Sequence, residues 1–181
     1  SRTQLGIGRS FQLTNIFPTL SVLENVRLAL QAKARVGMIF WRHWRSYTEM
    51  EDLAYELLKQ VMLDDRWAHA ASALTHGEQR KLEIAILLGL DPTVLLLDEP
   101  TAGMAPRERI ALMQLTADIV RDKGVSVMFT EHDMDVVFAH AHRIMVLNRG
   151  ELIADGTVDQ IRNDPRLQEV YLGGGTVFKS E

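Results

Sequence analysis

Two adjacent carboxylates, Asp98 and Glu99, have the residue types and the place in the chain that chemistry requires. They follow the apolar run 94–97, and Pro100 comes directly after them. Ligands of open parallel sheets bind beyond the carboxyl ends of the strands. There, one carboxylate can help to hold Mg²⁺ while the other orients or deprotonates a water molecule. The pair therefore indicates a nucleotide hydrolase, although two acids after a strand also occur as a plain helix N-cap.

A second candidate site is the segment Leu74–Gln79, where a helix is expected to begin. The start of a helix presents unpaired N–H groups and the positive end of the helix dipole to an anion. Gly77 allows close approach of the backbone, and the Thr75 hydroxyl can donate to a phosphate oxygen. A carboxylate at Glu78 would repel phosphate, so we expect that side chain to point aside. The alternative is an ordinary helix start without a ligand.

Two isolated polar residues complete the set of candidates. His132 follows an apolar strand expected over 125–130, and Gln12 follows a short strand expected over 5–11. Alone, a histidine at the end of a strand is more often structural, and a glutamine in a loop is more often a surface residue. Their order along the chain relative to the carboxylate pair is what makes them candidates for contact with a phosphate and with water.

Helices and strands must bring these separated residues together. Ser21–Glu24 and Thr48–Glu51 have the pattern of capping boxes, which predict helices over 21–33 and 48–63. Further helices are expected over 77–90, 107–123, 134–140 and from Thr157, with strands over 94–97, 125–130, 144–147 and 152–154 and turns at 148–150 and 155–156. Strands that alternate with helices indicate an α/β protein with a mainly parallel sheet.

The order and spacing of the candidate residues resemble the ATP-binding subunit of ABC transporters. Gln12 matches the Q-loop, Leu74–Gln79 the signature motif, Asp98-Glu99 the Walker B motif, Thr101–Pro106 the D-loop and His132 the switch histidine. The resemblance extends over essentially the whole chain. It implies a partial P-loop NTPase fold of the ABC ATPase type, with an inserted α-helical subdomain.

The same resemblance implies three parts of the chain. Residues 1–17 would be the end of the N-terminal catalytic core, with the Q-loop. Residues 18–90 would be the helical subdomain with the signature motif, and residues 91–181 would be the C-terminal half of the catalytic core.

The resemblance also implies a role for each side chain, with ATP and Mg²⁺ as the ligands. Asp98 would hold Mg²⁺ through water, and Glu99 would be the general base. His132 would contact the γ-phosphate, and Gln12 would contact Mg²⁺ and position the attacking water.

The signature motif would bind the ATP of the opposite subunit, so hydrolysis would require a dimer. Thr75, Gly77 and Glu78 are the residues implied. The usual pattern is Leu-Ser-Gly-Gly-Gln; here threonine replaces serine, His76 replaces the first glycine and glutamate replaces glutamine. The family usually has aspartate or asparagine where this chain has Ala105, which puts one contact across the dimer in doubt.

Several longer runs resemble the branched-chain amino acid importer branch of the family. These runs are Gly8–Gln12, Phe17–Val26, Gly77–Ala85 and Glu169–Gly173. The branch includes importers of urea and amides. The implied partners are permease subunits of the membrane and a second ATP-binding subunit, identical or paralogous, at the cytoplasmic face of the cell membrane.

The phosphate-binding loop Gly-x-x-x-x-Gly-Lys-Ser/Thr is absent from these residues. That loop supplies the backbone N–H groups and the lysine that grip the β- and γ-phosphates. We therefore expect a chain that has lost its N-terminal part, exposes apolar surface and is inactive alone. A second hypothesis is a non-catalytic module that associates with a permease or with a full-length ATPase. A soluble ABC ATPase of DNA repair or translation fits less well, because the chain has neither a long coiled coil nor a tandem cassette.

Composition limits the remaining function classes. The 181 residues are 46% hydrophobic and carry a net charge of −4, so nothing favours broad attraction to nucleic acid. There is no cysteine, which excludes disulfides and thiolate metal sites, and no apolar run is long enough to cross a bilayer. The cluster Phe40–Arg45 interleaves aromatic and basic residues, a pattern that could bind nucleic acid or a membrane interface. Contact with a partner protein is the favoured interpretation, with simple packing as the main alternative.

Overall fold

The computed structural model describes residues 7–9, 16–34, 44–165 and 167, without the side chains of 7–9 and 44–47. The described residues fall into two compact units, Ser1–Glu131 and His132–Glu181. Gln12 lies outside the described residues, and so do the side chains of the cluster Phe40–Arg45. The division into 1–17, 18–90 and 91–181 remains a prediction.

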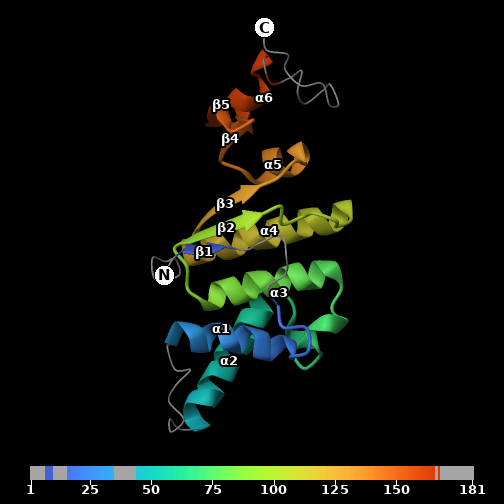
Figure 1. Ribbon diagram of the computed structural model, residues 1–181, viewed down its shortest axis with the longest axis vertical. Helices are drawn as coiled ribbons and strands as arrows, with labels where there is room; N and C mark the ends of the chain where they lie inside the picture. Colours follow the sequence, from blue (N-terminus) through green and yellow to red (C-terminus); the bar gives the residue numbers. More distant parts are fainter. Residues whose placement is uncertain (1–6, 10–15, 35–43, 166, 168–181) are drawn as a thin grey trace. The chain divides into compact units, whose positions relative to one another are not determined.

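The first unit contains a parallel sheet that carries the carboxylate pair at one edge. Its strands are β1 (Ile7–Arg9), β2 (Val94–Asp98) and β3 (Ser126–Thr130), in the order β1-β2-β3 (Figure 1). Leu95 and Leu97 lie on the same face of β2 and are buried, whereas Val94 and Leu96 on the opposite face are half-buried. The register sets Asp98 opposite Thr130, so the two strand ends lie side by side.

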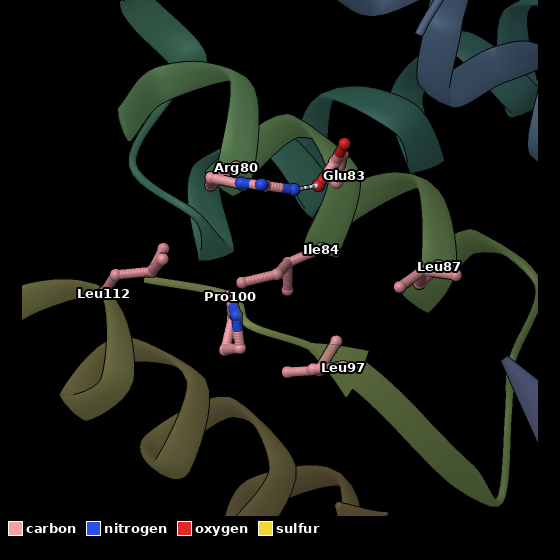
Figure 2. Close-up of a pocket in the computed structure, with 7 residues that line it drawn as sticks. All are labelled: Arg80, Glu83, Ile84, Leu87, Leu97, Pro100 and Leu112. Atoms are coloured by element: carbon pink, nitrogen blue, oxygen red, sulfur yellow. Dashed lines mark hydrogen bonds and ion pairs between the residues drawn. The ribbon is translucent and has the colours of Figure 1, made fainter. Parts of the chain in front are cut away.

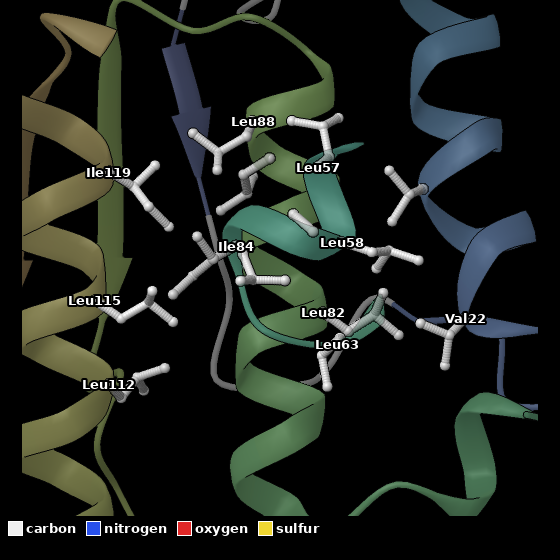
Figure 3. Packing of buried hydrophobic residues seen from close by; sticks show 14 of the residues in the cluster. Val22, Leu57, Leu58, Leu63, Leu82, Ile84, Leu88, Leu112, Leu115 and Ile119 are labelled. Carbon is white, nitrogen blue, oxygen red and sulfur yellow. The ribbon is translucent and has the colours of Figure 1, made fainter. Parts of the chain in front are cut away.

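Four helices pack in this unit around one apolar core. They are α1 (Val22–Ala34), α2 (Trp44–Gln60), α3 (His76–Gly89) and α4 (Pro106–Lys123), with short 3-10 turns η2 (Asp64–Arg66) and η3 (Ala71–Ala73). Figure 3 shows α3 between α4 and the strands on one side and α1 and α2 on the other, with leucine and isoleucine side chains filling the space. These elements confirm the mixed α/β fold with a mainly parallel sheet. Because α3 contacts both groups of elements, its first turn has a fixed place beside β2 and α4.

One of the two predicted capping boxes starts a helix. Ser21 caps α1: its backbone N–H donates to Glu24 Oε2 at 2.9 Å, and Glu24 N–H donates to Ser21 Oγ at 3.1 Å. The predicted start at Thr48 is wrong, because α2 begins at Trp44 and the Thr48–Glu51 pattern lies inside the helix. A Ser/Thr-x-x-Glu spacing also places two polar residues on one exposed helix face, so it does not by itself mark a start.

The second unit consists of α5 (Met134–His140), β4 (Arg143–Asn148), β5 (Glu151–Thr157) and α6 (Val158–Arg162). The two strands form an antiparallel hairpin. Arg149 and Gly150 connect them with φ values of 50° and 87°. Positive φ at both positions is what a two-residue type I′ turn requires, and glycine adopts it without strain.

The turn predicted at Asp155-Gly156 is wrong. Both residues belong to β5, where they pair with Met145 and Ile144. The Arg143 guanidinium binds the Asp155 carboxylate through two hydrogen bonds of 2.7 and 2.8 Å, which favours continued pairing over a turn. This ion pair lowers the pKa of Asp155, chiefly through the hydrogen bond from Arg143.

The start predicted for the last helix at Thr157 is confirmed by the capping box between Thr157 and Gln160. Across the described ranges, no helix is both long and apolar enough to cross a membrane.

Candidate functional site

The carboxylate pair at the end of β2 is held by Thr130 at the end of β3. Thr130 Oγ1 donates to Asp98 Oδ1 at 2.6 Å. The backbone N–H of Glu99 donates to the Thr130 carbonyl at 3.1 Å and to Thr130 Oγ1 at 3.2 Å. One threonine therefore fixes the side chain of the first acid and the backbone of the second.

Glu99 has a strained backbone. Its φ of 44° lies in the left-handed region, which side chains other than glycine, asparagine and aspartate rarely adopt. Strain of this kind costs on the order of 1–3 kcal/mol and persists where surrounding structure imposes it. Here the hydrogen bonds from the Glu99 N–H to Thr130 impose it.

The residues that follow the pair are buried and bound to β3 as well. Pro100 is buried, and Thr101 is only 2% exposed. The backbone N–H and the hydroxyl of Thr101 both donate to Glu131 Oε1, at 3.0 and 2.6 Å. Thr130 and Glu131 thus bind the chain at the end of β2 and just after it at three positions, Asp98, Glu99 and Thr101.

The candidate phosphate-binding segment is the N-terminus of α3, capped by Thr75. Glu78 N–H donates to Thr75 Oγ1 at 3.3 Å, and Thr75 N–H donates to Glu78 Oε2 at 2.8 Å. The second oxygen of Glu78 lies 3.3 Å from Arg66 Nε. These contacts keep the pKa of Glu78 below its usual value, first through the hydrogen bond from the Thr75 backbone and further through the nearby Arg66 charge.

The Glu78 side chain accordingly folds back onto its own helix start, in agreement with the expectation that it points aside. Thr75 Oγ1 accepts one hydrogen bond and keeps an O–H group that can donate to an anion. The negative charge of Glu78 is offset by Arg66 rather than presented to a ligand.

Gly77 lies in the first turn of α3 with a helical backbone. A methyl group on it would lie 3.4 Å from Met104 Cε and 4.0 Å from the Glu108 carboxyl group. Such contacts are ordinary, so the fold of this chain does not require glycine here. The requirement for glycine would have to come from a ligand or a second chain that approaches the backbone.

Below this helix start lies a buried ion pair. Arg80 Nη1 is 2.9 Å from Glu83 Oε2, and the two residues are only 6% and 8% exposed (Figure 2). They line a small cavity whose remaining lining residues are Ile84, Leu87, Leu97, Pro100 and Leu112. Burial raises the pKa of Glu83 despite the opposing effect of Arg80.

His132 is the first residue of the second unit and is exposed. It directly precedes Asp133, which caps α5 by accepting hydrogen bonds from the N–H groups of Asp135 and Val136. The structure therefore places His132 at a helix start that follows β3. Gln12 lies outside the described residues.

Within the part of the chain that the structure describes, no three side chains of the His, Cys, Asp and Glu types form a cluster for a metal ion. The single candidate ligand for Mg²⁺ among these residues is Asp98, with one oxygen bound to Thr130. Mg²⁺ retains several waters and usually takes one or two carboxylates together with substrate phosphates. The donor set thus fits a magnesium–nucleotide complex and not a magnesium ion held by protein alone.

Comparison with known proteins identifies the family. The family model described as "ABC transporter" matches residues 1–102, and the model described as "Branched-chain amino acid ATP-binding cassette transporter" matches residues 151–176. The high-affinity branched-chain amino acid transport ATP-binding protein LivG of Escherichia coli K12 is 34% identical over 175 residues. That match covers 94% of this chain and 69% of LivG. The chain belongs to the ABC transporter family of ATP-binding subunits.

Solved structures of this ABC transporter family share the fold. The ATP-binding cassette MJ1267 in its ADP conformation has a TM-score of 0.76 at 24% identity, over 95% of this chain and 70% of that one. The dimeric cassette MJ0796, bound to ADP and Pi after hydrolysis, has a TM-score of 0.69 at 32% identity, over 84% of this chain and 62% of that one.

Some contacts that shape this ABC subunit's site were not predicted from the sequence. Thr130, Thr101 and Glu131 bind the carboxylate pair or the turn after it, and His76 donates through Nε2 to the Ala102 carbonyl at 2.9 Å. Glu131 could have been found from its place, because it is an acid that directly follows β3. Its partner Thr101 lies in the corresponding place after the neighbouring strand β2, two residues beyond Glu99.

Proposed function

We propose that this ABC transporter subunit binds and hydrolyses ATP as one of a pair and drives an importer of branched-chain amino acids or related small amides. The observation that carries the proposal is the geometry at the end of β2. Asp98 is bonded to Thr130, and Glu99 is held in a strained conformation at the sheet edge. That arrangement suits a reaction in which Asp98 helps to bind a cation and Glu99 binds the attacking water.

The two carboxylates have separate tasks in this proposal. Bound ATP and Mg²⁺ supply the scissile phosphoanhydride bond and charge neutralisation at the phosphates. Asp98 would hold the cation through water, and the Thr130 hydroxyl fixes the direction of the Asp98 carboxylate. Glu99 orients the attacking water and accepts its proton on a carboxylate oxygen. Gln12 and His132 are proposed to position this water and to contact the γ-phosphate.

The start of α3 supports a role with the ATP of the second subunit. Thr75 offers an O–H donor, Gly77 leaves its backbone approachable, and Glu78 is turned away and paired with Arg66. The helix dipole favours an anion at this end. The dimer of the related cassette MJ0796, described with ADP and Pi, supports a paired arrangement.

The partners proposed are transmembrane permease subunits and a second ATP-binding subunit, identical or paralogous. The protein would lie on the cytoplasmic face of the cell membrane, held there by the permeases. The similarity to LivG and the match to the branched-chain amino acid model at residues 151–176 support the proposal that the importer carries branched-chain amino acids or related small amides.

The test uses the product of the complete reading frame that encodes this chain, purified with the permease subunits that accompany it and reconstituted into vesicles. ATP-dependent uptake is measured with labelled leucine, valine and urea. The wild type is expected to take up at least one of them, and Glu99→Gln is expected to abolish uptake and phosphate release together. Uptake that persists in Glu99→Gln would contradict the assignment of the general base.

A second candidate, a non-catalytic module, is favoured by one observation: the residues of this chain contain no Gly-x-x-x-x-Gly-Lys-Ser/Thr loop. This candidate predicts association with a permease without protection of the chain by ATP. Binding of the complex to permease subunits with no ATP turnover in the wild type would favour it over the proposal.

A further inference from the structure

The segment that joins β2 to α4 makes two tight turns immediately after the carboxylate pair. Ala102 N–H donates to the Glu99 carbonyl at 3.1 Å, and Met104 N–H donates to the Thr101 carbonyl at 3.2 Å. Glu99 and Gly103 both have positive φ, at 44° and 74°. We call residues 99–104 the post-strand turn. Its shape determines where the Glu99 backbone lies.

Glu131 holds this turn from the side of β3. One carboxylate oxygen accepts both donors of Thr101, at 3.0 Å from the backbone nitrogen and 2.6 Å from the hydroxyl oxygen. Hydrogen bonds to an ionised acceptor are stronger than neutral ones, and Thr101 is almost completely buried. The other oxygen, Glu131 Oε2, is buried and has no hydrogen-bond partner among the described residues. The carboxylate is therefore committed to Thr101.

His76 holds the same turn from the side of α3. A carbonyl oxygen only accepts, so His76 donates through Nε2 to the Ala102 carbonyl, at 2.9 Å. The imidazole also lies against Gly103, since a methyl group added there would be 3.5 Å from Nε2. His76 is the first residue of α3 and follows Thr75, whose hydroxyl is the proposed hydrogen-bond donor to a phosphate.

We propose that Glu131 and His76 are positioning residues that clamp the post-strand turn from two sides and thereby set the position of Glu99. This inference rests on the proposed ATPase function. The clamp connects the start of α3, the turn and the end of β3 through the side chains of His76 and Glu131, which bind backbone groups of the turn and the Thr101 hydroxyl. His132 directly follows Glu131 in the chain. A movement of the peptide between them would therefore move the Glu131 carboxylate and, through its hydrogen bonds, Thr101.

The same hydrogen bonds could merely stabilise the fold, and the two roles predict different results. A purely structural clamp lowers the melting temperature and leaves the turnover of the folded fraction unchanged. A positioning clamp changes turnover per folded molecule, with little change in the apparent KM for ATP, because Glu99 acts in the chemical step.

The first measurement is amide hydrogen exchange, resolved by residue, on the chain itself. Glu131→Ala is expected to speed exchange at the Thr101 N–H by about 10-fold or more relative to core amides of α3, because a charge-assisted bond is lost. His76→Ala is expected to speed exchange at the Ala102 and Met104 N–H groups. Glu151→Ala and His69→Ala, which change exposed residues of the same types, are the matched controls and should leave these amides unchanged.

The second measurement is ATP turnover by the reading-frame product with its permeases. Glu131→Ala and Thr101→Val are expected to lower kcat by about 10-fold or more, with KM changed less than about threefold. Thr101→Ser keeps both donors and should restore kcat to near the wild-type rate. Thr101→Val removes one of the two hydrogen bonds that Glu131→Ala removes, so the double variant should lower kcat no further than Glu131→Ala alone.

The outcomes separate the two proposals. If the wild type does not hydrolyse ATP, the proposed function fails, and the positioning role fails with it, whatever exchange shows. If the wild type hydrolyses ATP and the clamp variants keep their kcat while melting earlier, the proposed function stands and the positioning role is overturned. Unchanged exchange at Thr101 in Glu131→Ala would overturn the clamp itself.

Discussion

Gly77 separates what the fold requires from what the proposed ligand requires. Its backbone is helical, and an added methyl group would meet only the flexible end of Met104 at 3.4 Å. Alanine is more favourable than glycine in a helix by up to about 1 kcal/mol. The residue is therefore unfavourable for the helix, and the proposed close approach of a phosphate would account for it.

Gly77→Ala is expected to keep or raise the melting temperature while lowering ATP turnover of the assembled transporter by about 100-fold, the effect of misplacing a bound group by about 1 Å. Calorimetry and phosphate release measure the two effects. Gly89→Ala is the matched control, because the same change at the other end of α3 makes ordinary contacts of 3.5 Å with Ala29 and Leu57 and should leave turnover unchanged. Full turnover in Gly77→Ala would contradict the proposed role of the α3 start.

The strain at Glu99 gives a second prediction at this scale. Glu99→Gly and Glu99→Ala both remove the carboxylate, and both should abolish hydrolysis. The glycine variant relieves the left-handed strain, so its free energy of unfolding should exceed that of the alanine variant by about 1 kcal/mol, measured by urea denaturation.

The control for this pair is Glu56, which is exposed in the middle of α2. There the order should reverse, with alanine more stable than glycine by about 1 kcal/mol. Equal stability of the two Glu99 variants would show that the backbone relaxes out of the left-handed region and that the strain does not lower the free energy of unfolding.

Sequence reasoning located the residues whose signal is local. Asp98 and Glu99 follow an apolar strand, and Thr75 precedes a helix with Glu78 three residues on, so neighbours in the chain were enough to find them. Glu131 and His76 were missed as binding partners because their acceptor or donor groups lie 30 and 26 residues away in the chain. Pairing over such distances follows from strand register and helix packing, which no short motif contains.

Among the secondary-structure elements, α3 contains an ion pair that its position makes unfavourable. Arg80 and Glu83 are both buried, and Arg80 Nε and Glu83 Oε1 have no hydrogen-bond partner in the described part of the chain. Desolvation of two charges can exceed their mutual attraction. Removal of one partner of such a pair is therefore expected to lower the free energy of unfolding strongly, whereas replacement of both by apolar residues is expected to change it little.

Glu83→Leu alone is expected to lower the free energy of unfolding by about 3 kcal/mol, because it leaves Arg80 charged and buried. The double variant Arg80→Met with Glu83→Leu should be at least as stable as the wild type. Denaturant titration measures both, and Asp118→Ala, which breaks the exposed pair with Arg121, should cost less than about 1 kcal/mol. A double variant weaker than the single one would show that the pair is needed for packing.

The pH dependence of the same pair has a definite sign. Burial raises the pKa of Glu83 in the folded state above its value of 4.5 in the unfolded chain, so the folded state takes up the proton first. The stabilisation from this protonation is complete below pH 4.5 and is lost as the pH rises through the folded-state pKa. Relative to the double variant, the wild type should therefore gain stability as the pH falls toward 4.5.

Element boundaries were predicted well where a cap or a proline marks them and poorly elsewhere. The start of α1 and the start of α6 have capping boxes in the structure. The start of α2 at Trp44 has no such signal in the sequence. The Asp155-Gly156 dipeptide has the composition of a turn, and cross-strand pairing with the Arg143 guanidinium overrides that local preference.

The molecule as a whole consists of two compact units, joined at the peptide between Glu131 and His132. Large apolar side chains are exposed in each, including Met128 at 48% and Leu147 at 68%. Exposed apolar residues on strands are surfaces that a further segment or chain can cover.

The 181-residue chain alone is expected to bind ATP weakly and not to hydrolyse it, because it contains no lysine in a phosphate-binding loop to grip the β- and γ-phosphates. Phosphate release by the purified chain, with Glu99→Gln measured in parallel, tests this expectation. Turnover by the wild-type chain that disappears in Glu99→Gln would show that these residues suffice for catalysis.

The folded-back position of Glu78 has an evolutionary consequence. Its carboxylate already has a backbone donor at Thr75 and a cation at Arg66, so glutamine could replace it with the same donor and a similar shape. Exchange between glutamine and glutamate at this position is then expected to be close to neutral, since the side chain folds back onto Thr75 and Arg66. Sequences that keep Arg66 can therefore have either glutamate or glutamine at position 78. Without Arg66, the glutamate charge would be unpaired and glutamine would be favoured.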